Sequence, residues 1–492
     1  MWLLAALSAC TPTALLDPAA LPPETPGVVL LATASTTLVT VGGTVVTEQY
    51  VDIDEPTDDR DGFRYQILDG AGEVIYERTT NGPMVVQAFL GYWSDAAGVD
   101  LLDNLPVLGR FPLHVPLLPE GREVRFQLRD ETGAYREAGS YDLAYVEGDD
   151  MGTYDLVTGF ETLHSSGPSS NRMDLVILGD GYTAEEQGLF AEHADRVAEA
   201  LLAEAPYDTL APFINIHRVD TPSAESGASF DGPTAGPRDT AFGSIFAVEL
   251  INRLTGGNYN SVAVFQSKQW EVAQAASVVP WDTAIVLINT PKFGGMAVHV
   301  ASATTGFDGF ERTAIHEMGH SFGLLGDEYA YDACIQDPRL GLPVNITRDP
   351  QDPPWAHWID DDVPLPTPST SSWQGHVGAF SPAYNCGDLY RPRQNCTMRD
   401  STRGFCPVCT EQIVRRTFRF ADPVDGLSHG RMEGPVENVE LEWSRDGEVF
   451  ATSAPGERVR HGKRPFEVRA TYVTDHVRVG LDDLTQVYRY AP

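Results

Sequence analysis

The sequence contains few basic residues. Its 34 lysines and arginines are outnumbered by 70 aspartates and glutamates, which gives a formal net charge of −36 at pH 7. A chain with this charge repels nucleic acids and anionic membrane surfaces, because both are polyanions. We therefore expect no nucleic-acid partner.

The sequence also lacks a long apolar run. Beyond the N-terminus, no stretch approaches the ~20 consecutive apolar residues that a membrane-spanning helix requires. With 42% hydrophobic residues in a chain of 492, there is enough apolar material for two or three soluble domains with cores of their own. A G-x-G-x-x-G motif is absent as well, which argues against a dinucleotide-binding site.

Cysteine is scarce, and its placement is uneven. Five of the six cysteines lie in one region: Cys334, Cys386, Cys396, Cys406 and Cys409. This clustering favours an oxidising compartment. Five cysteines allow at most two disulfides among themselves, so we expect one free thiol. The single C-x-x-C, from Cys406 to Cys409, is too weak a signal for a redox site or a second zinc site, and we interpret it as structural.

The N-terminus, MWLLAALSAC, is a short apolar run that ends in Leu7-Ser8-Ala9-Cys10. It resembles the lipobox of bacterial lipoproteins, which predicts a signal segment at residues 1–10 and a lipid on Cys10. That implies an extracytoplasmic protein, secreted or anchored at the bacterial cell surface. The run has no basic residues before it, and the alternative is a ragged hydrophobic N-terminus. Residues 11–26 are rich in Pro, Ala and Thr and are typical of a linker.

The most informative segment is HEMGHSFGLLGDE, from His316 to Glu328. On a helix, residues four apart lie one above the other, so His316 and His320 can offer two imidazole nitrogens to one Zn²⁺. Glu317 then lies beside the metal rather than on it. From there it can accept a proton from a water and later pass it to a leaving amine, as a general base and acid.

The residues around the histidines predict where this helix packs and where it ends. Ile315, Met318 and Phe322 are spaced by three and four residues, which predicts an apolar stripe facing the core and leaves the histidines on a different face. Gly323 follows His320 by three residues. A glycine there can end the helix in the left-handed conformation, and the chain can then turn back with a third ligand.

Two carboxylates follow that turn, Asp327 and Glu328. Either could complete a three-ligand site that leaves one position open for water. We favour Asp327 as the third ligand and keep Glu328 as the alternative.

The segment HEMGHSFGLLGDEY resembles the zinc motif of the bacterial IgA peptidase family. These metallopeptidases are similar in layout to metzincins, whose motif is H-E-x-x-H-x-x-G-x-x-H/D. The third-ligand position of that motif falls on Gly326, which has no side chain to offer, so the third ligand lies one or two residues later. Three further segments also resemble the family: residues 171–190, 214–229 and 395–413. In the last of these, the resemblance implies that Met398 is the methionine beneath the metal site, and the alternative is an ordinary core residue.

The pattern of apolar segments and turn residues predicts three domains after the linker. Residues 27–147 contain short alternating segments such as Phe63–Ile67, Val74–Arg78 and Glu123–Leu128, which are typical of a β-sandwich. Residues 168–418 are expected to form the α/β, metzincin-like zinc peptidase domain. Residues 420–492 return to short strands, which favours a small immunoglobulin-like β-domain. The predicted strands of this last domain are Val439–Trp443, Val449–Ala451, Phe466–Tyr472 and Val477–Val479.

The α/β domain begins with a buried strand near Asp174, followed by a helix over Ala184–Ala203. Ala284–Asn289 is expected to form a central strand. Ala297–Ala303 alternates as a second strand just before the zinc helix. In metzincin-like enzymes the strand at this position borders the cleft, so we expect it to bind an extended peptide as an added strand.

Two further sets of residues are candidates for the cleft. Stabilising an oxyanion beside the metal needs a hydrogen-bond donor, and four tyrosines lie in suitable segments: Tyr329, Tyr331, Tyr384 and Tyr390. Tyr329 is the preferred one, although packing is the simpler role for each. Trp355, His357 and Trp358 are interpreted as a rim of the cleft, with aromatic packing as the alternative.

Together these features predict a lipid-anchored zinc endopeptidase, monomeric, that acts on proteins or peptides. Zn²⁺ is assigned to His316, His320 and Asp327, and Glu317 to proton transfer. One alternative is a non-catalytic surface binding lipoprotein with a metal-stabilised scaffold. Another is a zinc amidase that acts on cell-wall peptides.

Overall fold

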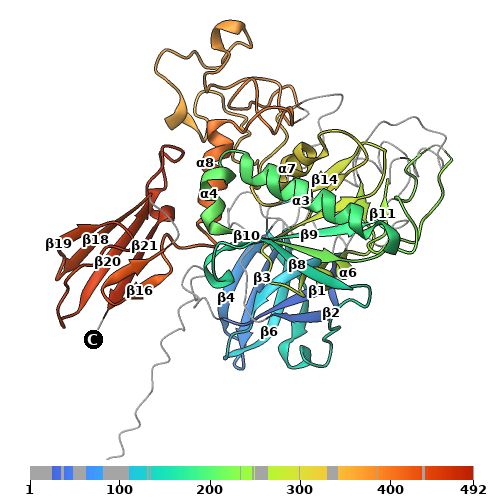
Figure 1. The fold of residues 1–492 in the computed structure, drawn as a ribbon, viewed down its shortest axis with the longest axis horizontal. Coiled ribbons are helices and arrows are strands. Elements are labelled where there is room, and N and C mark those ends of the chain that lie inside the picture. Colours follow the sequence, from blue (N-terminus) through green and yellow to red (C-terminus); the bar gives the residue numbers. More distant parts are fainter. Residues whose placement is uncertain are drawn as a thin grey trace, which may run out of the picture.

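The computed structural model describes residues 25–34, 38–47, 63–80, 110–129, 132, 134–232, 234–246, 249, 264–297, 300–329, 342–384, 386–434 and 438–490. The expected signal segment with Cys10 lies outside these ranges, as do most of the linker and Cys334. The described chain is mostly β and has several domains arranged around a central sheet (Figure 1).

The central sheet has six strands in the order β14-β15-β13-β9-β10-β8. Their bounds are Gly159–His164 (β8), Met173–Asp180 (β9), Ile214–Asp220 (β10), Thr283–Ile288 (β13), Gly295–Ala297 (β14) and Ala301–Thr304 (β15). The four inner strands are parallel, and β8 and β14 run antiparallel at the two edges. Every residue of β9 and β13 is buried, which explains why both read as continuous apolar runs. The predicted strands near Asp174 and Ala284 are confirmed.

Helices cover one face of this sheet. The two largest contributors are α3 (Gln187–Ala203) and α7 (Phe310–Ser321), which share a core with β9, β13 and β15. The predicted helix over 184–203 is confirmed, except that its first turn, Ala184–Glu186, is a 3-10 turn. Thr183 and Glu186 form a reciprocal capping box there, which satisfies two backbone donors at the start of the helix. The other helices in the described part of the chain are α4 (Tyr207–Leu210), α6 (Gln269–Ala276) and α8 (Pro407–Thr417).

Shorter elements connect these parts. The two-residue strands β11 (Ser244–Ile245) and β12 (Phe265–Gln266) pair with each other. The other 3-10 turns are η3 (Leu143–Tyr145), η4 (Ser169–Asn171), η6 (Ala211–Phe213), η7 (Ala356–Trp358), η8 (Ser371–Trp373) and η9 (Leu481–Leu484).

The N-terminal region consists of two antiparallel sheets that pack face to face. One has the order β2-β1-β5 and the other β4-β3-β6-β7. Their bounds are Gly27–Ala34 (β1), Val39–Thr47 (β2), Phe63–Asp69 (β3), Val74–Thr80 (β4), Arg110–Pro116 (β5), Gly121–Arg129 (β6) and Tyr135–Asp142 (β7). Phe63 lies at the centre of the shared core, in edge-to-face contact with Phe111 and stacked on Phe126.

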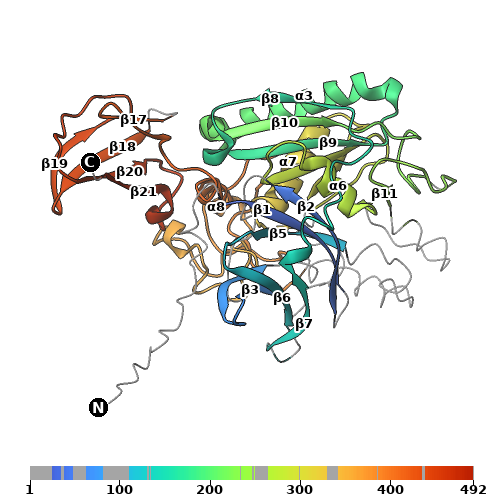
Figure 2. The same ribbon diagram turned by 90° about the horizontal axis from the view of Figure 1, so that it is seen from below.

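Strand β1 is buried on both faces. Val28 and Leu30 point into the N-terminal core, whereas Val29 and Leu31 join a second core with α6 and the remaining face of the central sheet. Figure 2 shows β1 between the central sheet and the layer of β3 and β6. The N-terminal region therefore serves as the second cover of the central sheet, which accounts for the unbroken apolar run in β1.

The C-terminal region contains a four-stranded antiparallel sheet in the order β19-β18-β20-β21 and a two-stranded pair, β16-β17. The bounds are Gly426–Ser428 (β16), Arg431–Glu433 (β17), Val439–Arg445 (β18), Glu448–Ser453 (β19), Phe466–Tyr472 (β20) and Thr485–Tyr490 (β21). Buried and exposed residues alternate along β18 and β20. Tyr472 packs against Phe213 and Phe418, so this sheet shares a continuous core with the central region.

One predicted strand of this region is wrong. Val477–Val479 is not a strand, and the last strand of the sheet is β21. The physical reason is a competing partner, since the backbone amides of Arg478 and Val479 donate hydrogen bonds to Oε1 of Glu411 on α8.

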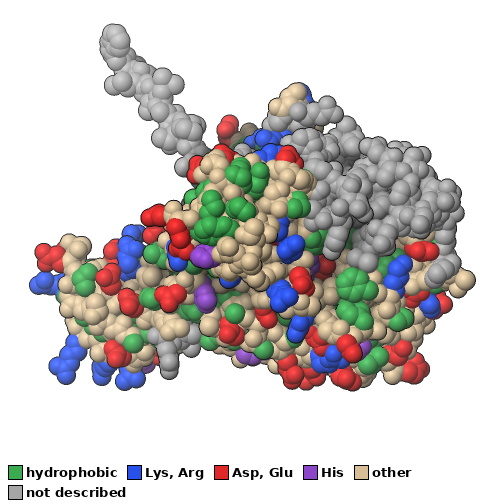
Figure 3. Space-filling view, turned by 90° about the horizontal axis from the view of Figure 1, so that it is seen from above, with side chains coloured by type: hydrophobic (Ala, Val, Ile, Leu, Met, Phe, Trp, Pro, Cys, Tyr) green, Lys and Arg blue, Asp and Glu red, His purple; other side chains and the backbone are tan. Residues whose placement is uncertain are grey.

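No helix among the described residues is both long enough and apolar enough to cross a membrane. On the face of the molecule shown in Figure 3, acidic side chains are spread among basic and apolar ones.

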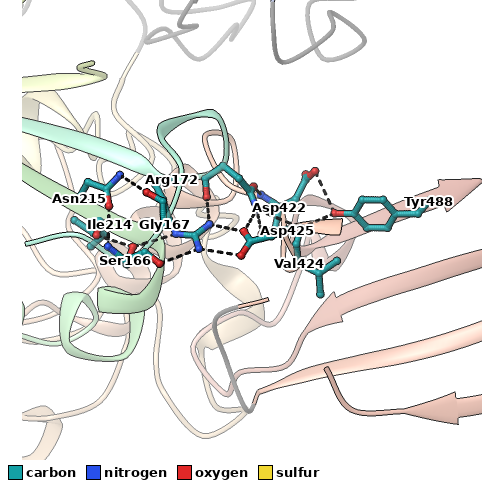
Figure 4. A network of polar contacts seen from close by, with 10 residues as sticks. Ser166, Gly167, Arg172, Ile214, Asn215, Asp422, Val424, Asp425 and Tyr488 are labelled. Atoms are coloured by element: carbon teal, nitrogen blue, oxygen red, sulfur yellow. Dashed lines mark hydrogen bonds and ion pairs between the residues drawn. The ribbon is translucent and has the colours of Figure 1, made fainter. Parts of the chain in front are cut away.

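A polar network joins the start of β9 to the segment that leads into the C-terminal sheet (Figure 4). Arg172 is almost fully buried, and its Nη1 lies 2.7 Å from Oδ1 of Asp425. Asn171 donates to the same carboxylate and to the carbonyl of Val424. Tyr488 of β21 donates to the carbonyl of Val424 at 2.9 Å. These contacts tie the two regions together by charge as well as by apolar packing.

Candidate metal centre

Helix α7 carries the histidine motif along the edge of the central sheet. Ile315, Met318 and Phe322 are buried in the core beneath it, as their spacing predicts. His316 and His320 lie one turn apart on another face, with ring centroids 4.8 Å apart. The helical arrangement expected for the motif is therefore confirmed.

The end of this helix differs from the expectation. Leu324, with φ of 52°, adopts the left-handed conformation that was predicted for Gly323. Gly323 is needed for a different reason, because a Cβ there would lie 2.7 Å from the carbonyl oxygen of Gly319. The backbone amide of Leu325 then donates to that same carbonyl, which closes the helix and turns the chain back toward the histidines.

Three atoms converge at the end of that turn. His316 Nε2 and His320 Nε2 are 3.2 Å apart, and Oδ1 of Asp327 lies 3.2 Å from the first and 3.1 Å from the second. Ligand atoms bound to a tetrahedral zinc at about 2.0–2.1 Å are separated by about 3.3–3.4 Å. The triangle of Nε2, Nε2 and Oδ1 therefore has the size of one face of a tetrahedral zinc site.

Hydrogen bonds on the far side of each ring fix which nitrogen faces this triangle. Nδ1 of His316 lies 2.8 Å from the carbonyl oxygen of Thr397, and Nδ1 of His320 lies 2.7 Å from that of Leu325. A carbonyl can only accept, so both Nδ1 atoms carry protons and both Nε2 atoms present lone pairs when the rings are neutral. Two facing lone pairs and a carboxylate repel one another unless a cation lies between them. The donor set thus fits a divalent metal.

The charges of the cluster are strongly coupled. Burial lowers the pKa of His320, but the carboxylate of Asp327 outweighs this effect and raises the pKa to about 9. The pKa of His316 shifts upward as well, because its contact with Asp327 exceeds the effect of burial. Burial raises the pKa of Asp327, but the two imidazoles oppose it and bring the pKa well below its usual range. A carboxylate held in its charged form is the form that binds a metal.

Glu317 is buried beside the histidines under the edge strand β14. A Cβ placed on Gly295 of β14 would lie 2.4 Å from Oε1 of Glu317, so only glycine allows the carboxylate to approach the strand this closely. Burial raises the pKa of Glu317, and the nearby His316 opposes that shift without cancelling it. A carboxyl whose pKa is raised is a better proton acceptor, as general-base catalysis requires.

The two neighbouring carboxylates point to different places. Asp327 faces the histidines, whereas Glu328 is fully buried on the other side of the chain, 3.3 Å from Sγ of Cys409. Asn345 holds the two carboxylates in these separate positions. Its side chain bonds both the amide and the carbonyl of Gly326, and its Nδ2 lies 3.1 Å from Glu328 Oε1.

Asn345 was missed by the sequence analysis. It lies 17 residues after Glu328 in a segment without a motif, and only its contacts reveal its role. Gly326, the residue that interrupts the metzincin pattern, packs against Pro343 and Ile346, where a Cβ would come within 2.9 Å of both side chains.

Met398 packs against the helix from below. It is fully buried, and its Sδ would lie 2.4 Å from a Cβ on Gly319 of α7. Its carbonyl accepts a hydrogen bond from the amide of Glu328 at 2.7 Å. The Met398 segment therefore contacts both helix α7 and the chain that returns to it.

Tyr329 lies beside the histidines, with its ring stacked on that of His316 at a centroid distance of 6.4 Å. Tyr384 donates its backbone amide to the carbonyl of Asp327, and the backbone of Tyr390 pairs with Thr347. Tyr331 lies outside the described residues.

The interpretation of Trp355 as a rim residue is wrong. Trp355 is buried, with its Nε1 donating to the carbonyl of Gly378. His357 and Trp358 both bond Oε2 of Glu411 at 2.7 Å. These residues therefore join α8 to the chain around it, which is the aromatic packing left open as the alternative.

The predicted strand over Ala297–Ala303 is also wrong in its extent. The segment belongs to two antiparallel strands, β14 and β15, and Val300 lies in a bend between them. Strand β15 is internal to the sheet, so β14 is the edge strand on the side of helix α7. His299 lies outside the described residues.

The expectation of a single free thiol is contradicted. Among the described residues, Cys396, Cys406 and Cys409 are all free and buried, and Cys386 is disulfide-bonded. The three free thiols and Glu328 place their ligand atoms within 4.8 Å of one another.

Taken together, the α/β sheet and its two-histidine, one-aspartate cluster with an adjacent glutamate define a hydrolase-type candidate metal centre. Residues 162–374 match the model of the family described as IgA Peptidase M64. This segment is similar to the IgA peptidase family, which confirms the resemblance seen in the sequence and supports a peptidase domain. No curated protein matches the chain.

Proposed function

We propose that the protein is a zinc-dependent endopeptidase that hydrolyses peptide bonds of extracellular proteins. The observation that carries this proposal is the triangle formed by His316, His320 and Asp327, with edges of 3.1–3.2 Å, next to the buried Glu317. A Zn²⁺ held by these three residues supplies a Lewis acid that lowers the pKa of a water and polarises the carbonyl of the scissile bond.

The residues of the chain supply proton transfer. Glu317 accepts the proton of the attacking water, because its raised pKa and its burial beside the histidines make the carboxylate a competent base. The same carboxyl then donates that proton to the leaving amine. Thr397 and Leu325 hold the imidazoles in place through their carbonyls, so the site is rigid before substrate arrives. Tyr329, beside His316, is the proposed donor to the developing oxyanion.

The substrate is proposed to bind along β14. Among the described strands, β14 pairs only with β15, and its Gly295 lies directly over the Glu317 carboxylate. An extended peptide that adds to this edge brings its backbone past the metal cluster, and main-chain hydrogen bonds give affinity without strict sequence requirements. The proposed peptide-binding strand is therefore residues 295–297 rather than residues 297–303.

The remaining parts of the chain are proposed to present the enzyme. Residues 27–147 are assigned to a β-sandwich and residues 420–492 to an immunoglobulin-like domain, both packed against the metzincin-like centre. Cys10 is proposed as a lipid anchor that places a monomeric enzyme outside the cytoplasm. Met398 is assigned the role of the methionine beneath the zinc.

The test is cleavage of denatured casein and of peptidoglycan by the purified full chain, before and after removal of metal by a chelator. The proposal predicts casein fragments, no release of cell-wall peptides, loss of activity on chelation and recovery with Zn²⁺. Glu317→Gln should abolish cleavage. The matched control is Glu311→Gln on the same helix, because Glu311 bonds Arg196 away from the cluster. Cleavage of peptidoglycan alone, or activity that survives chelation, contradicts the proposal.

A further inference from the structure

The four residues beside the candidate centre form a second cluster with the composition of a metal site. Cys396, Cys406, Cys409 and Glu328 are all buried, and their ligand atoms lie within 4.8 Å of one another. They come from three separate parts of the chain, namely the segment after α7, the loop before α8 and the first turn of α8. No disulfide and no established role accounts for them.

The distances within the cluster match a tetrahedral zinc. Sγ of Cys396 lies 3.6 Å from Sγ of Cys409, and Oε1 of Glu328 lies 3.3 Å from Cys409 Sγ and 4.0 Å from Cys406 Sγ. Sulfur atoms bound to one zinc at about 2.3 Å are separated by about 3.8 Å. A disulfide needs about 2.05 Å, so the sulfur atoms are spaced for a shared ion rather than for a bond to each other.

Backbone groups around the cluster stabilise the negatively charged thiolate form of its cysteines. Cys406 occupies the N-cap position of helix α8 and Cys409 lies in its first turn, so both cysteines are at the positive end of the helix. The amide of Cys406 also donates to Sγ of Cys396 at 3.3 Å. Backbone donors directed at sulfur are a common second shell of structural zinc sites, because they stabilise the thiolate form.

Glu328 provides the second line of evidence. Its side chain is completely buried, and its Oε2 has no hydrogen-bond partner among the described residues. A buried carboxylate with an unsatisfied oxygen is costly unless a cation binds it. The guanidinium of Arg391, itself nearly buried, is a charge of opposite sign that acts on Glu328. A divalent ion at the cluster removes this cost.

We propose that Cys396, Cys406, Cys409 and Glu328 bind a second, structural Zn²⁺. Four protein ligands leave no position for water, so this ion does not take part in hydrolysis. It fastens α8 and the Cys396 loop to the residue that follows Asp327. The second ion thereby holds Asp327, the third ligand of the candidate catalytic centre, in position. The proposal for the cysteine cluster does not depend on the function proposed for the histidine centre.

The test uses the full chain and two readouts that do not depend on activity. Metal content of the wild type should be about two zinc ions per chain, one for each site. His316→Ala/His320→Ala should keep about one. When zinc is replaced by Co²⁺, this double variant should retain the strong thiolate-to-cobalt charge-transfer absorption, because its remaining site contains three sulfurs. Cys396→Ser/Cys409→Ser should lose that absorption.

The control variant is Cys386→Ser, which breaks a disulfide outside the cluster and should leave the absorption unchanged. A wild-type protein with about one zinc that disappears in the double histidine variant overturns the proposal. Co²⁺-loaded wild type without thiolate absorption overturns it too, even if the cysteine variants fail to fold. Failure of the peptidase proposal gives a different result, namely two bound metals and no cleavage.

Discussion

Asp327 and Glu328 are adjacent in the sequence, yet their carboxylates serve two different clusters. Oδ1 of Asp327 lies within 3.2 Å of both histidine Nε2 atoms, and Oε1 of Glu328 lies 3.3 Å from Sγ of Cys409. Asn345 bonds the backbone of Gly326, just before Asp327, and the carbonyl of Met398 accepts the amide of Glu328. Any displacement of one carboxylate is therefore transmitted to the other.

Replacing each carboxylate separately should give different results. Asp327→Asn removes a ligand charge from the histidine cluster, so its zinc affinity should fall by more than the about 10–100-fold that loss of a supporting residue costs. Glu328→Gln should lower the thermal unfolding temperature while leaving the histidine site able to bind zinc. Chelator competition on the two variants measures the affinities. A larger loss of affinity in Glu328→Gln than in Asp327→Asn would show that Glu328 is the third ligand.

Asn345→Ala should weaken both clusters at once. The change leaves the buried amide of Gly326 without an acceptor, at a cost of about 1–3 kcal/mol in the free energy of unfolding. It also frees the loop that orients Asp327, so zinc affinity should fall by about 10–100-fold. Gln394→Ala, which removes one surface hydrogen bond to the carbonyl of Thr370, is the control. Unchanged zinc affinity in Asn345→Ala would contradict a positioning role.

The contact between Gly319 and Met398 predicts a reversal of sign in a double-mutant cycle. Gly319→Ala alone places a methyl group against the buried sulfur, and overpacking of about 1–3 kcal/mol should exceed the gain of about 1 kcal/mol in helix propensity. In a Met398→Ala background the obstruction is gone, and the same change should stabilise the protein. Thermal unfolding of the wild type, the two single variants and the double variant measures the coupling energy. If the two changes in stability simply add, the methyl group and the Met398 side chain do not obstruct each other.

Asp425→Asn should destabilise the protein at neutral pH by about 3 kcal/mol, because it leaves the buried Arg172 without a counter-charge. Burial raises the pKa of Asp425, but the hydrogen bonds from Arg172 outweigh it and lower the pKa in the folded state. The stabilising contribution is therefore complete above the unfolded value of about 3.9 and is lost as pH falls through the folded value.

Unfolding temperatures of wild type and Asp425→Asn should accordingly differ most near neutral pH and converge in acid. Asp422→Asn is the comparison, because burial raises the pKa of that carboxyl despite the hydrogen bond from Tyr488. Its loss should not destabilise the protein at neutral pH. A difference between wild type and Asp425→Asn that persists unchanged at low pH would rule out the ion pair as its source.

The parts of the account that were predictable from sequence depend on local spacing. His316 and His320 four residues apart, with an apolar stripe at Ile315 and Met318, fix a helix and its orientation. The continuous apolar runs of β9 and β13 likewise identify buried parallel strands. Such patterns can be recognised from the residues of a single helix or a single strand.

The remainder depends on contacts between distant segments. The choice between Asp327 and Glu328 is made by Asn345, and the strand expected at Val477–Val479 is replaced by bonds to Glu411 on α8. The three free thiols lie close together in the sequence, between residues 396 and 409, but Glu328 joins them only because the chain that follows α7 packs beside α8. Neither alternation nor motif spacing contains this information, because each partner is fixed by tertiary packing.

The most direct measurement of the central claim is zinc content and casein cleavage of wild type and Glu317→Ala, prepared in parallel. The account predicts that both proteins bind the same amount of zinc and that only the wild type cleaves casein, because Glu317 transfers protons without ligating the metal. Equal cleavage by both proteins, or loss of zinc from Glu317→Ala, would contradict the assignment of this residue as the general base of a zinc peptidase.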